Sequence, residues 1–138
     1  MTNNRFTIAI HTMTLLAVTE EEYLSSDYIA GSMNVHPVVV RKELAGLRRN
    51  GLVISKEGKS GGSALAKPAE KILLSDIYQA VRESALLGGD KHSPNPDCPV
   101  GKQINHHLSG LYEAAEEALV QRLGKTTLAA FSRQFEDE

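Results

Sequence analysis

The 138-residue chain is poor in cysteine, has no long apolar run and carries almost no net charge. Its one cysteine, Cys98, cannot form an intramolecular disulfide, and nothing else indicates an oxidising compartment. No apolar run approaches the ~20 residues that a membrane-spanning helix needs. The first residues lead into an amphipathic stretch without a cleavage site, so we expect no signal peptide. We expect one domain, or a small domain with an interaction arm, in the cytoplasm.

Charge is distributed unevenly along the chain. The formal net charge of −2 argues weakly against nucleic acid as a partner. Residues 36–67, however, contain seven basic and two acidic side chains, a local net charge of +5. Residues 111–138 contain three basic and six acidic side chains, a local net charge of −3. A basic segment beside an acidic one is typical of a phosphate-binding module joined to a separate solvated part.

Hydrophobic spacing and capping residues predict three helices in the first fifty residues. Apolar side chains at helical spacing predict the first, over residues 5–19. Serine and aspartate side chains suited to N-caps predict a short helix over residues 26–32, followed by a turn. Pro37 and Gly51 bracket a third helix over about 37–50, because proline suits a first helical turn and glycine the residue after the last turn.

A glycine-rich hairpin follows the third helix. Residues 52–56 have strand composition, residues 63–66 can return as a second strand, and a basic, glycine-rich tip lies between them. Ser75 is a candidate N-cap for a helix over residues 76–83. The remaining predicted elements are a loop over residues 84–98, a long helix over about 100–123 and a short helix over about 127–135.

The order of these elements is that of a winged helix-turn-helix: helix, short helix, turn, capped helix, hairpin. The predicted fold is therefore mainly α with a small β-hairpin wing, followed by a long C-terminal helix. We divide the chain into a DNA-binding domain over residues 1–83, a loop over residues 84–98, and a part over residues 99–138 that holds the dimerisation helix and the last helix.

The predicted DNA-binding residues follow from how such a motif meets DNA. Its second helix lies in the major groove, and the N-terminal residues of that helix face the base edges. Arg41 suits a bidentate contact with guanine, and Val38 suits contact with a thymine methyl group. The hairpin tip suits phosphates or the minor groove, because glycine lets backbone N–H groups approach closely. With two residues at the start of the first helix, where anions are favoured, the predicted set is Arg5, Thr7, Ser26, His36, Pro37, Val38, Val39, Arg41, Lys42, Lys56, Lys59, Ser60, Gly61 and Gly62.

Three other interpretations of these residues are weaker. A basic amphipathic helix is often only a solvated face, but here a basic hairpin follows a capped helix pair. An enzyme would need a joined set of groups, and no motif connects Asp76, Glu83, His92 and Asp97. The segment around Lys59 lacks the first glycine of a phosphate-binding loop. A pure protein-interaction module would explain the long apolar helix but not the basic segment. We therefore expect no enzyme.

Several segments of the chain together resemble the Rrf-two family of bacterial winged-helix transcription regulators. The match covers nearly the whole chain, and residues 51–62 are its most specific part. The segments that carry it are Arg5 to Ala17, Tyr28 to Ala30, Asn34 to Arg41, Leu44 to Val53, Gly58 to Pro68, Ile72 to Tyr78, and Cys98 to Gly101.

The resemblance implies a homodimer, held by the long helix over about 99–123, that binds a palindromic operator near a promoter in double-stranded DNA. Repression is the usual outcome in the family. An apolar stripe along the long helix independently supports a dimer, because a small domain has little surface to cover the stripe. The stripe consists of Val100, Ile104, Leu108, Leu111, Ala115 and Leu119.

Cys98 separates this chain from the cluster-binding members of that family, which carry three cysteines in the loop before the long helix. An iron–sulphur cluster needs about four ligands, mostly thiolates, and this chain offers only the last of those three cysteines. We therefore expect no cluster and no other cofactor.

Three interpretations of Cys98 stay open. The first is an incidental small residue at a helix start. The second is a redox-sensing thiol, because a helix N-terminus lowers a thiol pKa and Lys102 lies one turn further on. The third is a metal site shared with His92, His106 or His107, although helix histidines are commonly surface residues.

Overall fold

The computed structural model describes residues 4–19, 22–82 and 93–136. Within these ranges the chain is mostly helical, with one two-stranded antiparallel sheet. The predicted fold class, mainly α with a β-hairpin wing, is confirmed. No helix in the described ranges is both long and apolar enough to cross a membrane.

The first three helices form where the sequence predicts them, with boundaries within two residues. They are α1 (Arg5–Val18), α2 (Ser26–Met33) and α3 (Pro37–Arg49). The Ser25 hydroxyl caps α2 by accepting the Tyr28 N–H at 3.1 Å. Asn34 ends α2 in the left-handed region with φ 56°, a conformation that asparagine tolerates better than most residues. This sharp turn lets α3 follow α2 directly and pack against it.

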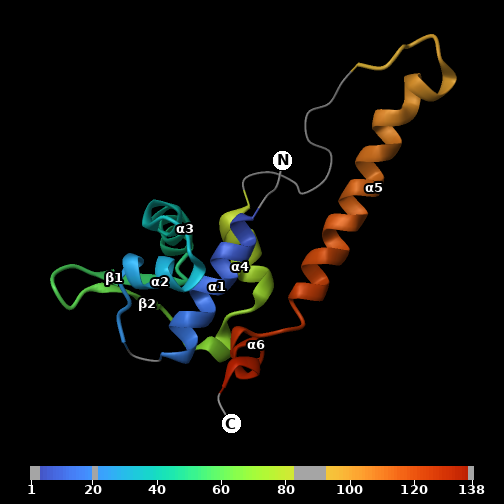
Figure 1. Cartoon of the computed structure of the whole chain (residues 1–138). Helices are drawn as coiled ribbons and strands as arrows, with labels where there is room; N and C mark the ends of the chain where they lie inside the picture. The colour runs from blue at the N-terminus through green and yellow to red at the C-terminus, as the bar shows by residue number, and fades with distance from the viewer. Residues whose placement is uncertain (1–3, 20–21, 83–92, 137–138) are drawn as a thin grey trace.

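The hairpin consists of β1 (Val53–Lys56) and β2 (Gly62–Leu65), paired antiparallel with Val53 opposite Leu65 and Lys56 opposite Gly62. Gly51, with φ 75°, lies between α3 and β1 as the capping pattern predicts. An isolated bridge between Leu24 and Ser63 ties β2 to the segment before α2. The hairpin projects from one side of the body, beyond the helices (Figure 1).

The predicted capping role of Ser75 is wrong. Helix α4 (Leu74–Val81) begins before Ser75, which lies inside the helix and is buried. The Asp76 carboxylate instead accepts the Leu73 N–H at 2.9 Å, which supports the start of the helix. A short 3₁₀ turn, η1 (Ala69–Lys71), precedes α4 and is absent from the sequence-based prediction.

The C-terminal helix α6 (Leu128–Ser132) packs against α1 and continues into the 3₁₀ turn η2 (Arg133–Phe135). Thr127 caps it by accepting the Ala130 N–H, and pairs with Leu73 in an isolated bridge. Leu128 is fully buried in the same core cluster as residues of α1, α3 and α4. The packing thus adds α6 to the N-terminal body, although it follows the long helix in the sequence.

The long helix α5 (Pro99–Leu123) has no buried residue. It contacts α4 near its C-terminal end, while the rest extends away from the body like a shaft (Figure 1). The core of the molecule therefore lies among α1, α2, α3, α4, α6 and the hairpin.

Candidate DNA interface

Helix α3 has a buried face and an exposed, positively charged face. The buried face consists of Val40, Glu43, Leu44, Gly46 and Leu47. On the other face Val38 is 59% exposed, and Arg41 and Lys42 are exposed one turn further along. In the described part of the chain neither of these two cations takes part in an ion pair. The cationic groups of this face are therefore available to an external anion.

The start of α3 is held by two local devices. Pro37 occupies its first position, where the missing N–H needs no partner. The His36 ring nitrogen Nδ1 accepts the Val38 N–H at 3.1 Å, so His36 caps the helix. His36 itself is exposed, whereas Pro37 and Val39 are half-buried. The predicted groove-facing residues thus differ in exposure, and the exposed ones are His36, Val38, Arg41 and Lys42.

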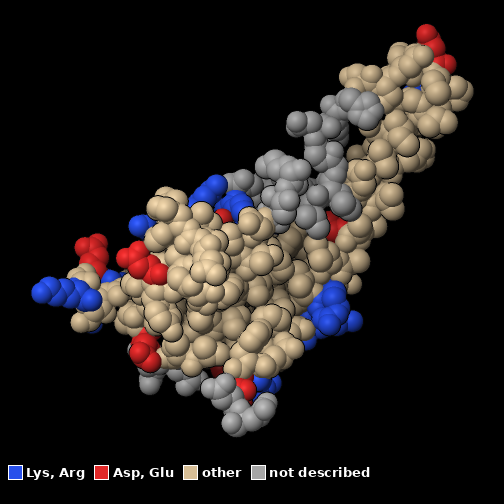
Figure 2. Space-filling view, viewed as in Figure 1, with Lys and Arg blue, Asp and Glu red and all other residues tan. Residues whose placement is uncertain are grey.

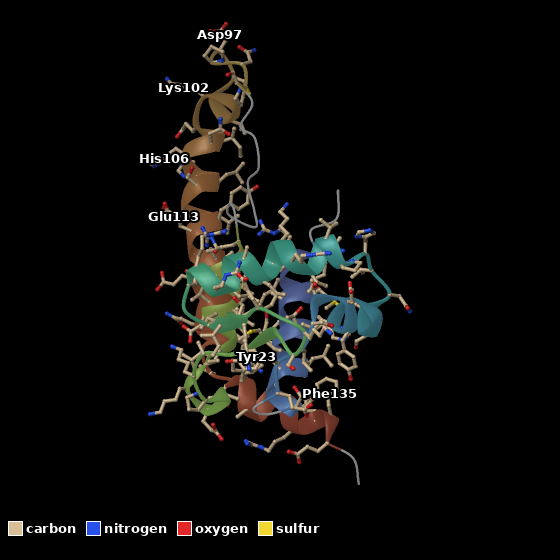
Figure 3. The ribbon with its side chains drawn as sticks, turned by 90° about the vertical axis from the view of Figure 1, so that its left-hand side faces the viewer. Tyr23, Asp97, Lys102, His106, Glu113 and Phe135 are labelled. Atoms are coloured by element: carbon tan, nitrogen blue, oxygen red, sulfur yellow. The ribbon has the colours of Figure 1, made fainter. Side chains whose placement is uncertain are left out.

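The hairpin lies on the same side of the molecule as α3. Figure 3 views that side, where α3 crosses the body above the hairpin and α5 rises behind them. The Lys56 ammonium lies 5.7 Å from the centre of the Tyr23 ring, within the range of a cation–π contact. Lys59 and Ser60 are exposed at the tip. Figure 2 shows Lys and Arg side chains at the hairpin tip and over α3.

Gly61 and Gly62 are required by the packing of the hairpin. A Cβ atom on Gly61 would lie 2.0 Å from the Lys56 carbonyl oxygen, and one on Gly62 would lie 2.3 Å from the Leu24 carbonyl oxygen. The Gly61 N–H donates to the Gly58 carbonyl oxygen at 3.0 Å within the turn. Close packing is therefore sufficient to explain both glycines, and their predicted contact with phosphate stays a prediction.

Two predicted residues of α1, Arg5 and Thr7, differ in their exposure and in their contacts. Thr7 is exposed, as a phosphate ligand must be. The Arg5 side chain is only 20% exposed, and its Nε donates to both carboxylate oxygens of Glu43 at 3.0 and 3.1 Å. The Arg5 guanidinium therefore contacts α3, whereas the sequence analysis predicted only a contact with DNA phosphate.

Three exposed residues of α2 and α3 are absent from the predicted set. Tyr28 on α2 is 58% exposed, whereas the predicted Ser26 is half-buried at the first position of that helix. Arg48 and Arg49 are exposed in the last turn of α3. Tyrosine and arginine both donate hydrogen bonds to phosphate, and all three residues stand in segments already assigned to the motif. Only their exposure, which the sequence does not give, distinguishes them from their neighbours.

The apolar stripe of α5 contains no fully buried residue. Val100 and Leu111 are 66% and 61% exposed, and Ile104, Leu108, Ala115 and Leu119 are half-buried. Figure 2 shows the projecting part of α5 with few Lys, Arg, Asp or Glu side chains in that view. An uncovered apolar patch of this kind marks an interaction surface.

The base of α5 is anchored to the body by polar contacts. The Tyr78 hydroxyl donates to the Glu116 carboxylate at 3.0 Å, and Arg82 forms an ion pair with the same carboxylate. The Phe6 ring meets the Tyr78 ring edge-on, with 5.5 Å between their centres. These contacts connect α5 through α4 to α1.

Cys98 lies at the far end of α5, as its exposed N-cap residue. Hydrogen bonds from the backbone N–H groups of Gly101 and Val100 lower the pKa of the thiol below its ordinary value. His106 lies eight residues along the helix, about 12 Å away at 1.5 Å per residue, too far to share a metal ion with Cys98 in one chain. His92 lies outside the described residues.

The donor set does not fit an iron–sulphur cluster. The chain has one cysteine, and the described ranges bring together no group of three His, Cys, Asp or Glu side chains that could hold a metal ion. The enzymatic alternative gains no support either. Asp76 caps α4 in the body, Asp97 lies near the tip of α5 (Figure 3), and Glu83 and His92 fall outside the described residues.

Comparison with known proteins agrees with this geometry. The family described as "Rrf2: Iron-dependent Transcriptional regulator" matches residues 2–134. YwnA of Bacillus subtilis (strain 168), named as an HTH-type transcriptional regulator, is 36% identical over 128 residues, which cover 93% of this chain and 94% of YwnA.

Solved structures resemble the chain over almost its full length. One, described as a DNA-binding protein, is 31% identical with a TM-score of 0.72, and the match covers 92% of this chain and 97% of that one. The oxidized form of Staphylococcus aureus CymR is 25% identical with a TM-score of 0.66, and the match covers 100% of both chains. The winged helix-turn-helix, the long C-terminal helix and these matches together show that the chain belongs to the Rrf2 (Rrf-two) family of transcriptional regulators.

Proposed function

We propose that the protein is a homodimeric repressor that binds a palindromic operator in double-stranded DNA, with α3 of each subunit in the major groove. The exposed face of α3 carries the proposal: Val38, Arg41 and Lys42 project from it, and the hairpin tip with Lys59 lies on the same side. Arginine and valine are suited to base edges, and the hairpin and α2 to phosphates.

The uncovered stripe of α5 supports the dimer. A 25-residue helix without a buried residue is unstable as a solitary shaft, because most helical stability in proteins comes from packing an apolar face. A second copy offers the same stripe and gives a symmetric interface. Two-fold symmetry then places the two recognition helices about 34 Å apart, one turn of DNA.

Repression is the outcome that the resemblance to the family implies for an operator near a promoter. We further propose that the protein is no enzyme, works without an iron–sulphur cluster and acts in the cytoplasm, where its DNA is. The single cysteine supports regulation without a cluster, and the scattered positions of the titratable side chains support a purely DNA-binding role.

A redox response through Cys98 is a second proposal on how the dimer is controlled. The thiol is exposed, and its lowered pKa increases the fraction of reactive thiolate at neutral pH. A peroxide would oxidise the thiolate to a sulfenic acid, and a second thiol, from the partner subunit or a small molecule, would then form a disulfide with loss of water. Because Cys98 lies at the end of the proposed dimerisation helix, either product would alter how two α5 helices meet.

Selection from a random pool of DNA duplexes tests the main proposal. The wild-type protein should enrich a palindromic sequence, bind it as a dimer, and lose affinity steeply as salt rises, because bound phosphates release counterions. Enrichment of no sequence, or affinity independent of salt, contradicts the proposal. Transcription from a promoter carrying the enriched site should fall when the protein is added, and a rise would contradict repression.

A further inference from the structure

The recognition helix carries a carboxylate on its inner face. Glu43 lies on α3 directly after Lys42, yet its side chain is only 2% exposed. A buried carboxylate is costly unless a cation and hydrogen bonds compensate for the lost water. On α3 it lies among apolar side chains such as Val40, Leu44 and Leu47.

Arg5 supplies that cation from a distant part of the chain. It opens α1, 38 residues before Glu43, and its Nε reaches both carboxylate oxygens at 3.0 and 3.1 Å. The contact is therefore a direct bond between α1, the central helix of the body, and α3, the helix that faces DNA.

A buried ion pair differs from its apolar neighbours in being directional. Apolar contacts tolerate small rotations, because the hydrophobic effect depends on buried area and not on angle. Hydrogen bonds weaken steeply when the donor and acceptor are misaligned. Replacing a buried ion pair by apolar side chains often leaves stability unchanged or improves it, so such a pair is better suited to specifying one arrangement than to strengthening it.

Rotation of α3 about its axis decides which side chains reach the bases. One residue turns an α-helix by about 100°, so a direction fixed at Glu43 also fixes the direction of Arg41, about 200° away on the opposite face, and that of Lys42, about 100° away. We propose that the Arg5–Glu43 pair is a positioning device that sets the rotation of α3 and thereby its sequence specificity. This inference rests on the proposed function of α3 and assigns Arg5 to positioning where the sequence predicted a phosphate contact.

The test compares specific with non-specific binding. One duplex is the sequence that the wild-type protein enriches from a random pool, and the other is a shuffled duplex of equal length and composition. The double variant Arg5→Met/Glu43→Leu removes one charge of each sign and leaves the net charge unchanged. Glu70→Leu/Lys71→Met makes the same chemical change at two exposed positions of η1 and is the matched control.

In the double variant, the ratio of the affinity for the enriched duplex to the affinity for the shuffled duplex should fall about tenfold. This loss is comparable to that of one base contact. Its affinity for the shuffled duplex, and the salt dependence of that affinity, should stay within about twofold of wild type, because the positioning pair makes no phosphate contact. The control variant should match wild type on both duplexes.

An unchanged ratio in the folded double variant overturns the positioning role, and so does an equal loss on both duplexes, which indicates a role in folding alone. If circular dichroism shows that the double variant is unfolded, Arg5→Lys decides, because it keeps the charge and removes the guanidinium. A reduced ratio for Arg5→Lys supports the proposal and an unchanged ratio overturns it. If wild-type protein enriches no sequence, the proposed function fails, and the positioning role fails with it.

Discussion

Helices α3 and α5 are both exposed, but their exposed faces are opposite in chemistry. Helix α3 buries an apolar face in the body and presents Arg41 and Lys42 outward. Helix α5 has no fully buried residue and carries a partly exposed apolar stripe. A charged face backed by a packed face suits a rigid reader of a polyanion, whereas an apolar face without backing suits a partner helix.

The attachment of the two helices to the body differs as well. Helix α3 contacts α1, α2, α4 and β1, and the partly buried Arg5–Glu43 pair connects it to α1. Helix α5 contacts α4 near one end, where Glu116 meets Tyr78 and Arg82. Among the described residues, α3 therefore packs against four elements, whereas α5 is attached near one end.

A charge placed on the α5 stripe should have the largest effect. Leu111→Glu puts a carboxylate into the proposed interface at a residue that is 61% exposed in the single chain, so the subunit should still fold. The dimer should dissociate, and affinity for the operator should fall by about 10²–10⁴-fold, because the two half-sites are no longer bound together. Size-exclusion chromatography with light scattering and gel-shift titration measure the two effects.

His106→Glu is the matched control for Leu111→Glu. His106 is exposed on the opposite side of α5 from the stripe, so this variant gains the same carboxylate there and should remain a dimer with unchanged affinity. If Leu111→Glu is also dimeric and binds the operator like wild type, the stripe is not the dimer interface. The proposed division of roles, with α3 binding DNA and α5 binding a second subunit, would then be wrong for α5.

The Arg5→Met variant tests the anchoring of α3. It leaves the Glu43 carboxylate buried without its cation, which should reduce the free energy of unfolding by about 3–5 kcal/mol. Urea denaturation measures this change. The exposed Lys71→Met should alter stability by about 0.5 kcal/mol or less. Equal stability of the two variants would show that α3 is held by its apolar face alone.

Local sequence signals predicted most of the fold because they act over a few residues. Pro37 and Gly51 bracket α3 correctly, since each restricts its own backbone. Ser75 was a wrong capping assignment, because several polar residues near a helix start can compete and here Asp76 supports the start. The sequence also supplied no sign that α6 packs on α1, since a short apolar helix after α5 is compatible with packing on the body or on α5.

The candidate interface was less predictable, because exposure and pairing depend on contacts distant in sequence. In the sequence, Glu43 entered only the charge count of the basic segment. Its ion-pair partner, Arg5, lies 38 residues away. Tyr28 has a large aromatic side chain of a kind often found in protein cores, but it is 58% exposed. The sequence thus identified the segments that we propose to face DNA, and the structure was needed to distinguish residues that are exposed from those that hold the segments in place.

Arg41→Ala should weaken operator binding by about 1–3 kcal/mol and relax specificity at one base position, because arginine in the major groove contacts a base edge. Lys59→Ala at the hairpin tip should weaken all sequences alike and reduce the salt dependence by about one counterion. Titrations of the enriched and shuffled duplexes distinguish the two patterns. Undiminished operator binding by both variants would contradict the assignment of α3 and the hairpin to DNA.

The smallest effect is expected at Cys98, at the free end of α5. Because backbone hydrogen bonds lower the pKa of the thiol, the thiolate should form at lower pH than in free cysteine, and iodoacetamide should alkylate Cys98 fastest relative to free cysteine near neutral pH. Mass spectrometry of samples quenched across a pH series measures this rate, and Cys98→Ser should take up no label. An alkylation profile identical to that of free cysteine would remove the chemical basis of the redox proposal. The alkylation profile could be shifted while peroxide changes operator binding equally in wild type and Cys98→Ser. That result would show that the thiol is reactive but does not control operator binding.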